Sequence, residues 1–419
     1  MLPASLLPRR QLTDNKVGAC IGFDISALDS TFKSHAQRGI GRYVGELSSY
    51  FKRELTSSKQ ALKIENFDHS SVRAGSSGLL KVCSNLTRLT PCGRTTINQQ
   101  LLYPLQLSRY THSKGRGFDA LHFPAHMDAP AWGLRRYALT VLDLIPLVLE
   151  PLYRANKSGL RFKFARWLEI QAIKNATLVI AISQNTAADV QRILGVPEER
   201  ICVTPLGVDQ KFFAAKLIDE EETLRRRYKL EPKAPIVLYV GGIDPRKNCK
   251  GLIGSLALLQ QKLKQQGKGS AQLLMAGEIR SDREFPRLSA LIEEHGLTDS
   301  IKLAGFVPDH DLLQLYRISS VFFFPSLYEG FGLPPLEAMA AGLPVVSSAR
   351  SSMSEVLGQG AMLVNPEDIE QCAEALFQVL SSNELARELE AKGRKQAGLF
   401  SWQKTGELTL QAYEKLLAQ

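Results

Sequence analysis

Short runs rich in β-branched and aromatic residues alternate with helical patterns along the whole chain, and this alternation constrains the fold most strongly. The runs are 17–24, 120–124, 138–143, 177–183 and 201–205 in the first half, and 235–242, 271–277, 300–307, 320–326, 344–348 and 361–365 in the second. Helical patterns follow them, in the first half at about 41–53, 155–174 and 184–194. Strands that alternate with helices form parallel sheets through crossover connections. The sequence therefore predicts an α/β protein.

The length of 419 residues indicates more than one domain, because single domains usually hold about 100 to 200 residues. We predict two doubly wound, Rossmann-like domains at 1–205 and 206–398, and a helix at 399–419 that packs back toward the N-terminal domain. The stretch 69–117 has no period and is rich in Ser, Gly and Arg, so we expect a long mobile insertion there. Two such domains leave a cleft lined by the carboxyl ends of both sheets, where ligands bind in open α/β sheets.

Composition excludes several classes of protein. Hydrophobic residues make up 44% and charged residues 22%, which is typical of a soluble globular protein. No uncharged apolar run approaches the ~20 residues of a membrane-spanning helix, and the N-terminus lacks the order of charges that marks a secretory signal. The six cysteines stand singly, with no CxxC pair and no histidine at zinc spacing. We therefore expect a cytoplasmic protein with free thiols and no metal site.

Positive charge is concentrated in the first half of the chain. Residues 1–200 carry 27 Lys and Arg against 15 Asp and Glu, whereas 201–419 carry 25 against 27. Nucleic-acid motifs are missing, so an anionic membrane or an anionic small molecule is the expected partner rather than nucleic acid. The stretch 153–174 carries six Lys and Arg against one Glu, interleaved with Phe162, Phe164 and Trp167. It is either a contact with anionic lipid or a solvated basic face over a buried stripe, and the sequence leaves both open.

The stretch "FFFPSLYEGFGLPPLEAMAAGLPVV" places two glutamates around a strand end and a helix start. Glu329 lies in the loop after the strand, and Glu337 lies in the first turn of a helix that a Pro-Pro pair begins. Gly330 and Gly332 allow backbone amides to approach a ligand, and the helix start favours an anion or a sugar hydroxyl. Two glutamates alone would be explained by solvation and the helix dipole. Their glycine and proline context favours a binding site.

A second candidate site follows the strand "IVLYVGG", where "IDPRKNCKG" leads into a helix that we start after an N-cap at Asn248. Arg246 and Lys247 then crowd the positive end of that helix, which is unfavourable unless a negative group binds there. This is an argument for a bound phosphate, against the simpler interpretation of two solvated basic residues. Gly241 and Gly242 would also permit a close approach of the backbone.

The first half offers two weaker candidates. The first is the turn "QRGIGRYVGEL", in which Gly39 and Gly41 lead into a helix; a tight strand-to-helix turn would explain these glycines equally well. The second is "LHFPAHMDAP", where His122 and His126 lie at a strand end near Asp128. A single histidine is more often structural than catalytic, so His126 is the better candidate only by its position toward the cleft.

Several motifs occur in an order that resembles the retaining glycosyltransferase family 4, whose members have the GT-B fold. They are "RGIGRY", "DLIP", "VIAISQNTAADV", "VTPLGVD", "YVGGIDPRKN", "LAGFVPDHDL", "FPSLYEGFGLPPLEAMAAGLPVV" and "FSWQKTGELTLQAY". The resemblance covers nearly the whole chain and is more specific in the second half.

The resemblance implies roles for both glutamates and for the loop between them. Glu337 matches the second glutamate of the family's E-x7-E motif, which holds the ribose hydroxyls of a nucleotide, and Glu329 matches the first, near the transferred sugar. Backbone amides of the connecting loop would reach the sugar and the diphosphate; they belong to Gly330, Phe331, Gly332 and Leu333.

The resemblance also implies a phosphate site and two departures from the family pattern. Lys247 with Arg246 matches the basic pair that neutralises the diphosphate, and Gly41 matches the glycine loop that closes on it. Relatives often have His-Asp before "LIP", but this chain has Leu142-Asp143, so no histidine can act there. The N-domain histidine of the family aligns uncertainly with "HFPAH", which makes His126 a candidate catalytic residue.

The implied reaction is transfer of a hexose, with retention, from a nucleotide diphosphate sugar to a glycan acceptor without a metal ion. Relatives with these motifs suggest GDP-mannose first, with a UDP-sugar as the alternative, and an acceptor in O-antigen, lipopolysaccharide or exopolysaccharide synthesis at the cytoplasmic face of the membrane. A non-catalytic glycan-binding relative would be expected to lose Lys247, Glu329 and Glu337, which are all present. An oxidoreductase would require GxGxxG directly after a strand, which neither half shows.

Overall fold

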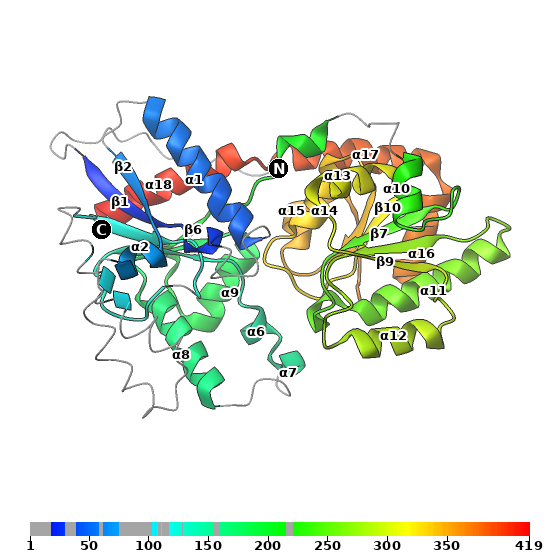
Figure 1. Ribbon diagram of the computed structural model, residues 1–419, viewed down its shortest axis with the longest axis horizontal. Coiled ribbons are helices and arrows are strands. Elements are labelled where there is room, and N and C mark those ends of the chain that lie inside the picture. Colours follow the sequence, from blue (N-terminus) through cyan, green and yellow to red (C-terminus); the bar gives the residue numbers. More distant parts are fainter. Residues whose placement is uncertain are drawn as a thin grey trace.

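The computed structural model describes residues 18–29, 39–57, 62–74, 103–104, 106–107, 110, 117–127, 129–153, 160–214 and 221–419. These residues form two α/β domains that lie side by side, with the earlier part of the chain in one and the later part in the other (Figure 1). The first 17 residues, Asp128 and most of the predicted insertion lie outside the described residues.

The N-terminal sheet has six parallel strands in the order β2-β1-β3-β4-β5-β6. The strands are β1 (Ala19–Asp24), β2 (Leu62–Phe67), β3 (Ala120–Phe123), β4 (Tyr137–Val141), β5 (Leu178–Ala181) and β6 (Ile201–Val203). The helices of this domain are α1 (Ile40–Ser57), α2 (His69–Ala74), α6 (Ile145–Val148), α7 (Glu150–Tyr153), α8 (Leu160–Asn175) and α9 (Gln184–Leu194).

Helices cover both faces of this sheet, because successive strand residues point to opposite sides. On β4, Ala138 belongs to the apolar cluster that contains Tyr43 of α1, whereas Leu139 belongs to the cluster that contains Leu168 of α8 and Val190 of α9. Burial on both faces explains why the central strands are continuous apolar runs in the sequence.

The C-terminal sheet also has six parallel strands, in the order β12-β11-β10-β7-β8-β9. The strands are β7 (Ile236–Val240), β8 (Gln272–Ala276), β9 (Ile301–Gly305), β10 (Val321–Phe324), β11 (Val345–Ser348) and β12 (Met362–Val364). The helices are α10 (Glu221–Arg227), α11 (Cys249–Gln265), α12 (Phe285–Glu294), α13 (Asp309–Ile318), α14 (Leu333–Ala340), α15 (Met353–Leu357), α16 (Ile369–Ser381) and α17 (Asn383–Ala397).

The strand orders place a topological switch point in each sheet. In the C-terminal sheet the chain runs from β7 outward to β8 and β9, then returns to β10 beside β7 and continues to the other edge. In the N-terminal sheet β1 likewise lies between β2 on one side and β3 on the other. Connections leave such a pair of strands in opposite directions, which opens a crevice at their carboxyl ends. The candidate residues follow β1, β3, β7 and β10.

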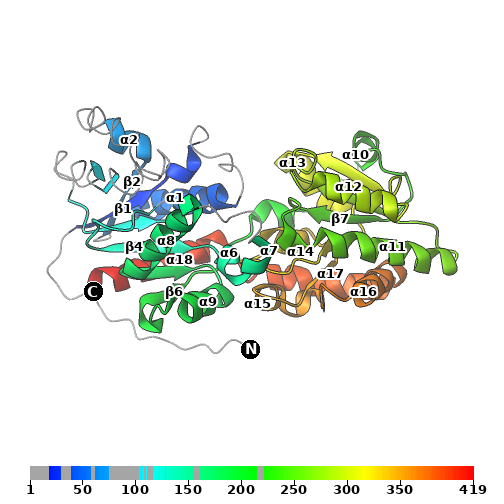
Figure 2. The same cartoon turned by 90° about the horizontal axis from the view of Figure 1, so that it is seen from below.

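The last helix, α18 (Trp402–Ala418), lies among the elements of the N-terminal domain in both views (Figures 1 and 2). Thr405 begins this contact by donating a hydrogen bond from Oγ1 to the carbonyl of Pro205, 2.7 Å away. Further along, the Tyr413 hydroxyl lies 2.7 Å from Nδ1 of His122 on β3. The chain therefore returns to its first domain after it completes the second.

The predicted fold of two doubly wound α/β domains is confirmed, whereas the exact domain boundaries stay a prediction. Two local predictions are wrong. The sequence analysis assigns no strand to 62–67, where β2 forms a sheet edge and buries only its last residue fully. The two ends of the predicted insertion are also structured, because α2 covers 69–74 and the side chains of Tyr103 and Leu107 are buried in the core.

Candidate functional site

The junction between β7 and α11 presents two cations to the cleft. A short 3-10 helix, Pro245–Lys247, follows the strand, and Asn248 then begins α11 in a left-handed conformation with φ of 53°. Its Oδ1 accepts a hydrogen bond of 3.1 Å from the amide of Gly251, as an N-cap should. The predicted helix start is confirmed, and it holds Arg246 and Lys247 just before the positive end of α11.

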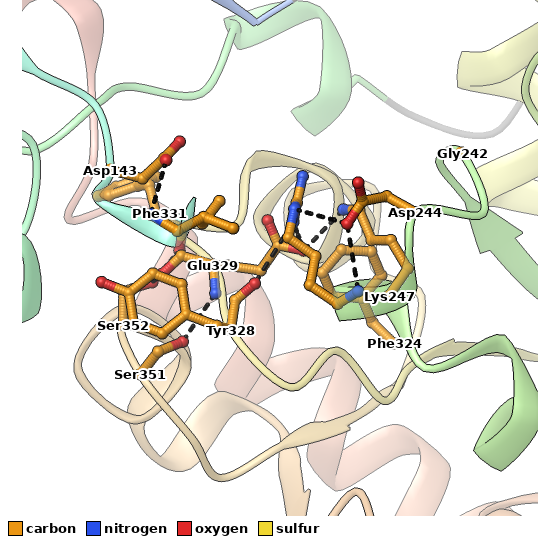
Figure 3. A network of polar contacts seen from close by, with 12 residues as sticks. Asp143, Gly242, Asp244, Lys247, Phe324, Tyr328, Glu329, Phe331, Ser351 and Ser352 are labelled. Atoms are coloured by element: carbon orange, nitrogen blue, oxygen red, sulfur yellow. Dashed lines mark hydrogen bonds and ion pairs between the residues drawn. The ribbon is translucent and has the colours of Figure 1, made fainter. Parts of the chain in front are cut away.

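Both cations bind the same carboxylate (Figure 3). Nζ of Lys247 and Nη1 of Arg246 each lie 2.6 Å from Oε1 of Glu329. The Lys247 ammonium also lies 4.4 Å from the centre of the Phe324 ring, where a cation–π contact stabilises it. Oδ1 of Asp244 also lies 3.7 Å from Nε of Arg246, so two carboxylates stand beside the two cations of this cluster.

Glu329 is ionised in this setting. Burial alone would raise the pKa of its carboxyl, but the charges of Lys247 and Arg246 outweigh burial and lower it. The backbone around it is held as well, since Ser351 Oγ accepts a hydrogen bond of 2.9 Å from the amide of Glu329. Ser352 Oγ donates to the Glu329 carbonyl, 2.9 Å away. The loop after β10 is therefore fixed on the side facing α15.

Glycines shape the start of α14. Gly332 is the N-cap, with φ of 99°, and its position offers no room because a Cβ there would lie 2.2 Å from Cε of Met353. At Gly330 a Cβ would lie 2.1 Å from the carbonyl oxygen of Leu142 in the other domain. No side chain caps the start of α14, but Pro334 and Pro335 have no N–H and the amide of Leu336 donates to the carbonyl of Gly332, so Leu333 is left to offer a free amide in this turn.

Glu337 is the fifth of the eight residues of α14, just beyond the first turn in which we expected it, and its buried side chain contacts both domains. Arg42 of α1 reaches across the cleft and donates from Nη1 to Oε1 of Glu337. The Tyr316 hydroxyl donates to Oε2 over 3.1 Å. Burial raises the pKa of Glu337, and Arg42 and Tyr316 offset that rise only in part. The two glutamates of the motif therefore have opposite shifts of pKa.

A cavity of about 350 Å³ joins these elements between the two domains. The sequence-predicted residues that line it are Gly242, Arg246, Lys247, Leu333 and Glu337. Arg42 lines it from the N-terminal domain. Its size matches the lower range of small-molecule pockets, and its cations favour an anionic ligand.

Other predicted residues lie beside the cavity rather than in its wall. Glu329 stands behind the cations that it binds. The Phe331 ring is buried against Phe400, with ring centres 5.7 Å apart, so that only its backbone can reach a ligand. We expected Gly41 in the cavity wall, but it lies in the first turn of α1 and does not line the cavity. Gly39, two residues earlier, lines it instead.

The two histidines have other partners in this structure. His126 lies away from the cavity wall, with Nε2 2.9 Å from Oε1 of Glu169 on α8. His122 is fully buried, and its Nε2 lies 2.8 Å from Thr140 Oγ1. Burial lowers the pKa of His122 to about 3, so its ring is neutral. His126 does not line this cavity, because its ring turns to a carboxylate on a neighbouring helix, and its catalytic role stays a prediction.

Sequence reasoning missed four residues of the site. Arg42, Lys211, Asp309 and Tyr316 all belong to the group around Glu337, and Lys211 Nζ lies 3.0 Å from Oδ2 of Asp309. Arg42 belongs to the motif "RGIGRY" and directly follows Gly41. Its position beside the predicted glycine turn could therefore have indicated that it lies at the cleft. Asp309 and Tyr316 come from α13 and Lys211 from the 3-10 helix Gln210–Phe213, and only the fold brings these two elements to Glu337.

Among the residues that the structure describes, no group of three or more His, Cys, Asp or Glu side chains is arranged to hold a metal ion. Within the same residues, the helices are too short or too polar to cross a lipid bilayer.

Two doubly wound domains with a ligand cleft between them define the GT-B class of proteins. One solved structure with this fold is sucrose-phosphate synthase from Thermosynechococcus elongatus, which is 24% identical, with a TM-score of 0.70, and covers 96% of this chain and 99% of that chain. Another is HepE from Anabaena in complex with UDP-glucose, at 17% identity and a TM-score of 0.67, covering 96% of this chain and 100% of that chain. At these identities the likeness shows the fold alone.

Family models then identify the chain more closely. The model described as Glycosyltransferase Family 4 matches residues 38–212, and the model described as Glycosyl transferases group 1 matches residues 220–396. Together the two models cover most of the chain. The protein therefore belongs to glycosyltransferase family 4.

Curated relatives include several mannosyltransferases. The serotype-specific mannosyltransferase WbdA of Escherichia coli is 31% identical over 277 residues, which are 66% of this chain and 33% of WbdA. The O-antigen chain mannosyltransferase B of the same species is 30% identical over 246 residues, 59% of this chain and 62% of that protein. The MMP α-(1→4)-mannosyltransferase of Mycolicibacterium hassiacum is 28% identical over 335 residues, 76% and 75% of the two chains. The matched part thus spans about a third of WbdA.

Proposed function

We propose that this protein is a retaining glycosyltransferase that moves a hexose from a nucleotide diphosphate sugar to a glycan acceptor. One observation carries the proposal: Arg246, Lys247 and Glu337 line a single cavity at the switch point between β7 and β10. A nucleotide diphosphate sugar has an anionic diphosphate for the two cations and ribose hydroxyls for the carboxylate. Nucleoside diphosphates and dinucleotides share these features, and membership of the glycosyltransferase family favours the nucleotide sugar among them.

The difficult step is the break between the anomeric carbon and the diphosphate oxygen, because the electron pair leaves with the diphosphate. Arg246 and Lys247 would stabilise that charge from fixed positions, with the amide of Leu333 at the start of α14. Glu329 supports them by holding both cations in place, 2.6 Å from its Oε1. The acceptor oxygen then bonds to the anomeric carbon on the face that the diphosphate left, and its proton passes to the departing diphosphate oxygen. These cations would make a metal ion or cofactor unnecessary.

GDP-mannose is the donor that we propose. Support comes from the mannosyltransferases among the curated relatives, two of which are named for serotype-specific or O-antigen synthesis. The same relatives support a glycan acceptor in O-antigen, lipopolysaccharide or exopolysaccharide assembly. The presence of all three predicted donor ligands, Lys247, Glu329 and Glu337, favours catalysis over a non-catalytic glycan-binding role.

We also propose that the protein works in the cytoplasm, against the inner face of the membrane. On α8, Phe164 and Trp167 are 42% and 53% exposed, and their rings stack with centres 5.9 Å apart. Exposed aromatic rings next to a basic residue, here Lys163, suit the interface of an anionic bilayer. Of the two interpretations of this stretch, lipid contact has the support of these exposed rings. The side chain of Phe162 lies outside the described residues.

A donor screen tests the proposal. Thermal stability would be measured with GDP-mannose, GDP-glucose, UDP-glucose and UDP-N-acetylglucosamine, followed by nucleotide release in the presence of glycan acceptors. We expect the largest stabilisation and the fastest release with GDP-mannose. A UDP-sugar in that place would change the donor and keep the reaction, whereas no response to any of the four would contradict the function.

The variant Lys247→Ala gives the same screen a mechanistic control. Loss of a charge that stabilises the leaving group should lower turnover about 100-fold or more, with a smaller loss of donor affinity. Lys250→Ala removes the same charge from an exposed position on α11 and should leave turnover unchanged. Full activity of Lys247→Ala would remove the argument for a diphosphate at this lysine.

A further inference from the structure

Arg42 is a residue of the N-terminal domain that occupies the ligand site of the C-terminal domain. It lies in the first turn of α1, and its side chain is 18% exposed. Nη1 contacts Oε1 of Glu337, and Nη2 lies 3.2 Å from Oδ2 of Asp309. Its guanidinium thus joins two carboxylates of the other domain.

This contact satisfies the carboxylate that the proposed donor requires. Oε1 of Glu337 is held by Arg42, and Oε2 accepts the hydroxyl of Tyr316 over 3.1 Å. The Glu337 side chain is only 5% exposed. A carboxylate oxygen can accept more than one hydrogen bond, but a side chain this deeply buried leaves a ribose hydroxyl no access unless one of these partners moves aside. Tyr316 is fully buried beneath α14, so Arg42 is the partner that can leave.

Arg42 has a second position available when it leaves Glu337. Asp309 is 61% exposed at the rim of the cavity, and it already binds both Arg42 and Lys211. Staying with Asp309 would spare the guanidinium the cost of an unpaired, partly buried charge. The exchange is therefore a short movement between two adjacent carboxylates rather than an exit into solvent.

We propose that Arg42 competes with the ribose of the donor for Glu337, so that donor binding moves Arg42 onto Asp309 and breaks an ion pair between the domains. The inference rests on the proposed function, because it takes Glu337 as the ribose ligand. In the free enzyme Arg42 competes with the donor for Glu337. The apparent affinity for the donor is then the intrinsic affinity multiplied by the fraction of molecules in which Glu337 is free. This competition also makes the contact between the domains respond to the loading of the cleft.

The test compares Arg42→Ala with wild type by calorimetric titration at about pH 8, well above the ordinary pKa of a glutamate. The probes are GDP and 2′,3′-dideoxy-GDP, which lacks the hydroxyls that would displace Arg42. We expect Arg42→Ala to bind GDP about tenfold more tightly than wild type, as for a pair formed in about nine molecules of ten. The affinity for the dideoxy probe should not change. Arg53→Ala, an equal loss of charge at an exposed position of the same helix, should leave both affinities as in wild type.

A second variant tests the route by which Arg42 leaves. Asp309→Asn removes the charge that would receive Arg42, so it should weaken GDP binding, and this effect should disappear in the Arg42→Ala background. Weaker or unchanged binding of GDP by Arg42→Ala would overturn the inference, because Arg42 would then be a ligand of the donor or a bystander. Failure of the wild type to bind GDP or UDP, or to distinguish GDP from its dideoxy form, would overturn the proposed function and the inference with it.

Discussion

Glu329 and Glu337 stand eight positions apart on one loop-and-helix segment, yet their surroundings shift the pKa values of their carboxyl groups in opposite directions. Two cations beside Glu329 outweigh its burial and lower the pKa of its carboxyl. Burial dominates at Glu337 and raises its pKa, despite Arg42 and Tyr316. The first carboxylate is thus a permanent counter-ion for the phosphate site, and the second is held less firmly in its charged form.

This difference predicts the pH dependence of nucleotide binding. Ribose hydroxyls donate to the ionised form of Glu337, so protonation competes with binding, and the affinity for GDP-mannose should fall as the pH is lowered through the raised pKa of Glu337. Glu329 stays ionised longer because its pKa is lowered. Calorimetric titration with GDP-mannose, which has no terminal phosphate that titrates near neutral pH, at a series of decreasing pH values measures this loss.

Glu337→Gln serves as the control for that titration. An amide keeps the shape of the side chain but does not titrate, so this variant should bind GDP-mannose more weakly at neutral pH, and its affinity should change little as the pH is lowered. An affinity of the wild type that is constant over the whole range would contradict the assignment of Glu337 as the ribose ligand.

At the scale of elements, the site residues lie at junctions between a strand and the following helix. The sequence predicted the two junctions of the C-terminal domain, which precede α11 and α14. Glycine, proline and an asparagine N-cap mark the starts of α11 and α14 locally, and both helices begin where the sequence indicates. Local patterns could not show that β2 forms a sheet edge, since "LKIENF" lacks the continuous apolar run of the buried strands.

The rest of the site depends on contacts between distant parts of the chain. Arg42 and Glu337 are separated by 295 positions and meet only because two domains face each other. His126 shows the same dependence: its loop follows β3 at the switch point, and its ring lies beside Glu169 on α8. The charge of a neighbouring helix cannot be read from the motif that contains the histidine.

Helix α8 is predicted to contact an anionic membrane. Wild-type protein should co-sediment with vesicles that contain phosphatidylglycerol and much less with vesicles of phosphatidylcholine alone, because both aromatic burial and charge contribute. Replacing Phe164 and Trp167 together with Ser should reduce the bound fraction several-fold. Leu399→Ser removes an equally exposed apolar side chain from the connection between α17 and α18 and should have no effect. Equal binding of the double variant and wild type would exclude α8 as the lipid contact.

At the scale of the whole molecule, the two domains touch through groups that adjoin the cleft. Glu355 of α15 accepts hydrogen bonds of 2.8 and 2.9 Å from the amides of Gln184 and Asn185 at the start of α9. Tyr328, next to Glu329, donates its hydroxyl to Asp189 on the same helix. The loop that carries Glu329 is therefore fastened to both domains, so a movement between the domains would reach the phosphate site directly.

A crystal structure of the complete chain with GDP-mannose tests the central claim most directly. The account predicts the diphosphate within hydrogen-bond distance of Arg246 and Lys247, the ribose hydroxyls on the carboxylate of Glu337, and Arg42 turned to Asp309. A nucleotide bound at another surface, with Lys247 and Glu337 still engaged only by protein side chains, would contradict it.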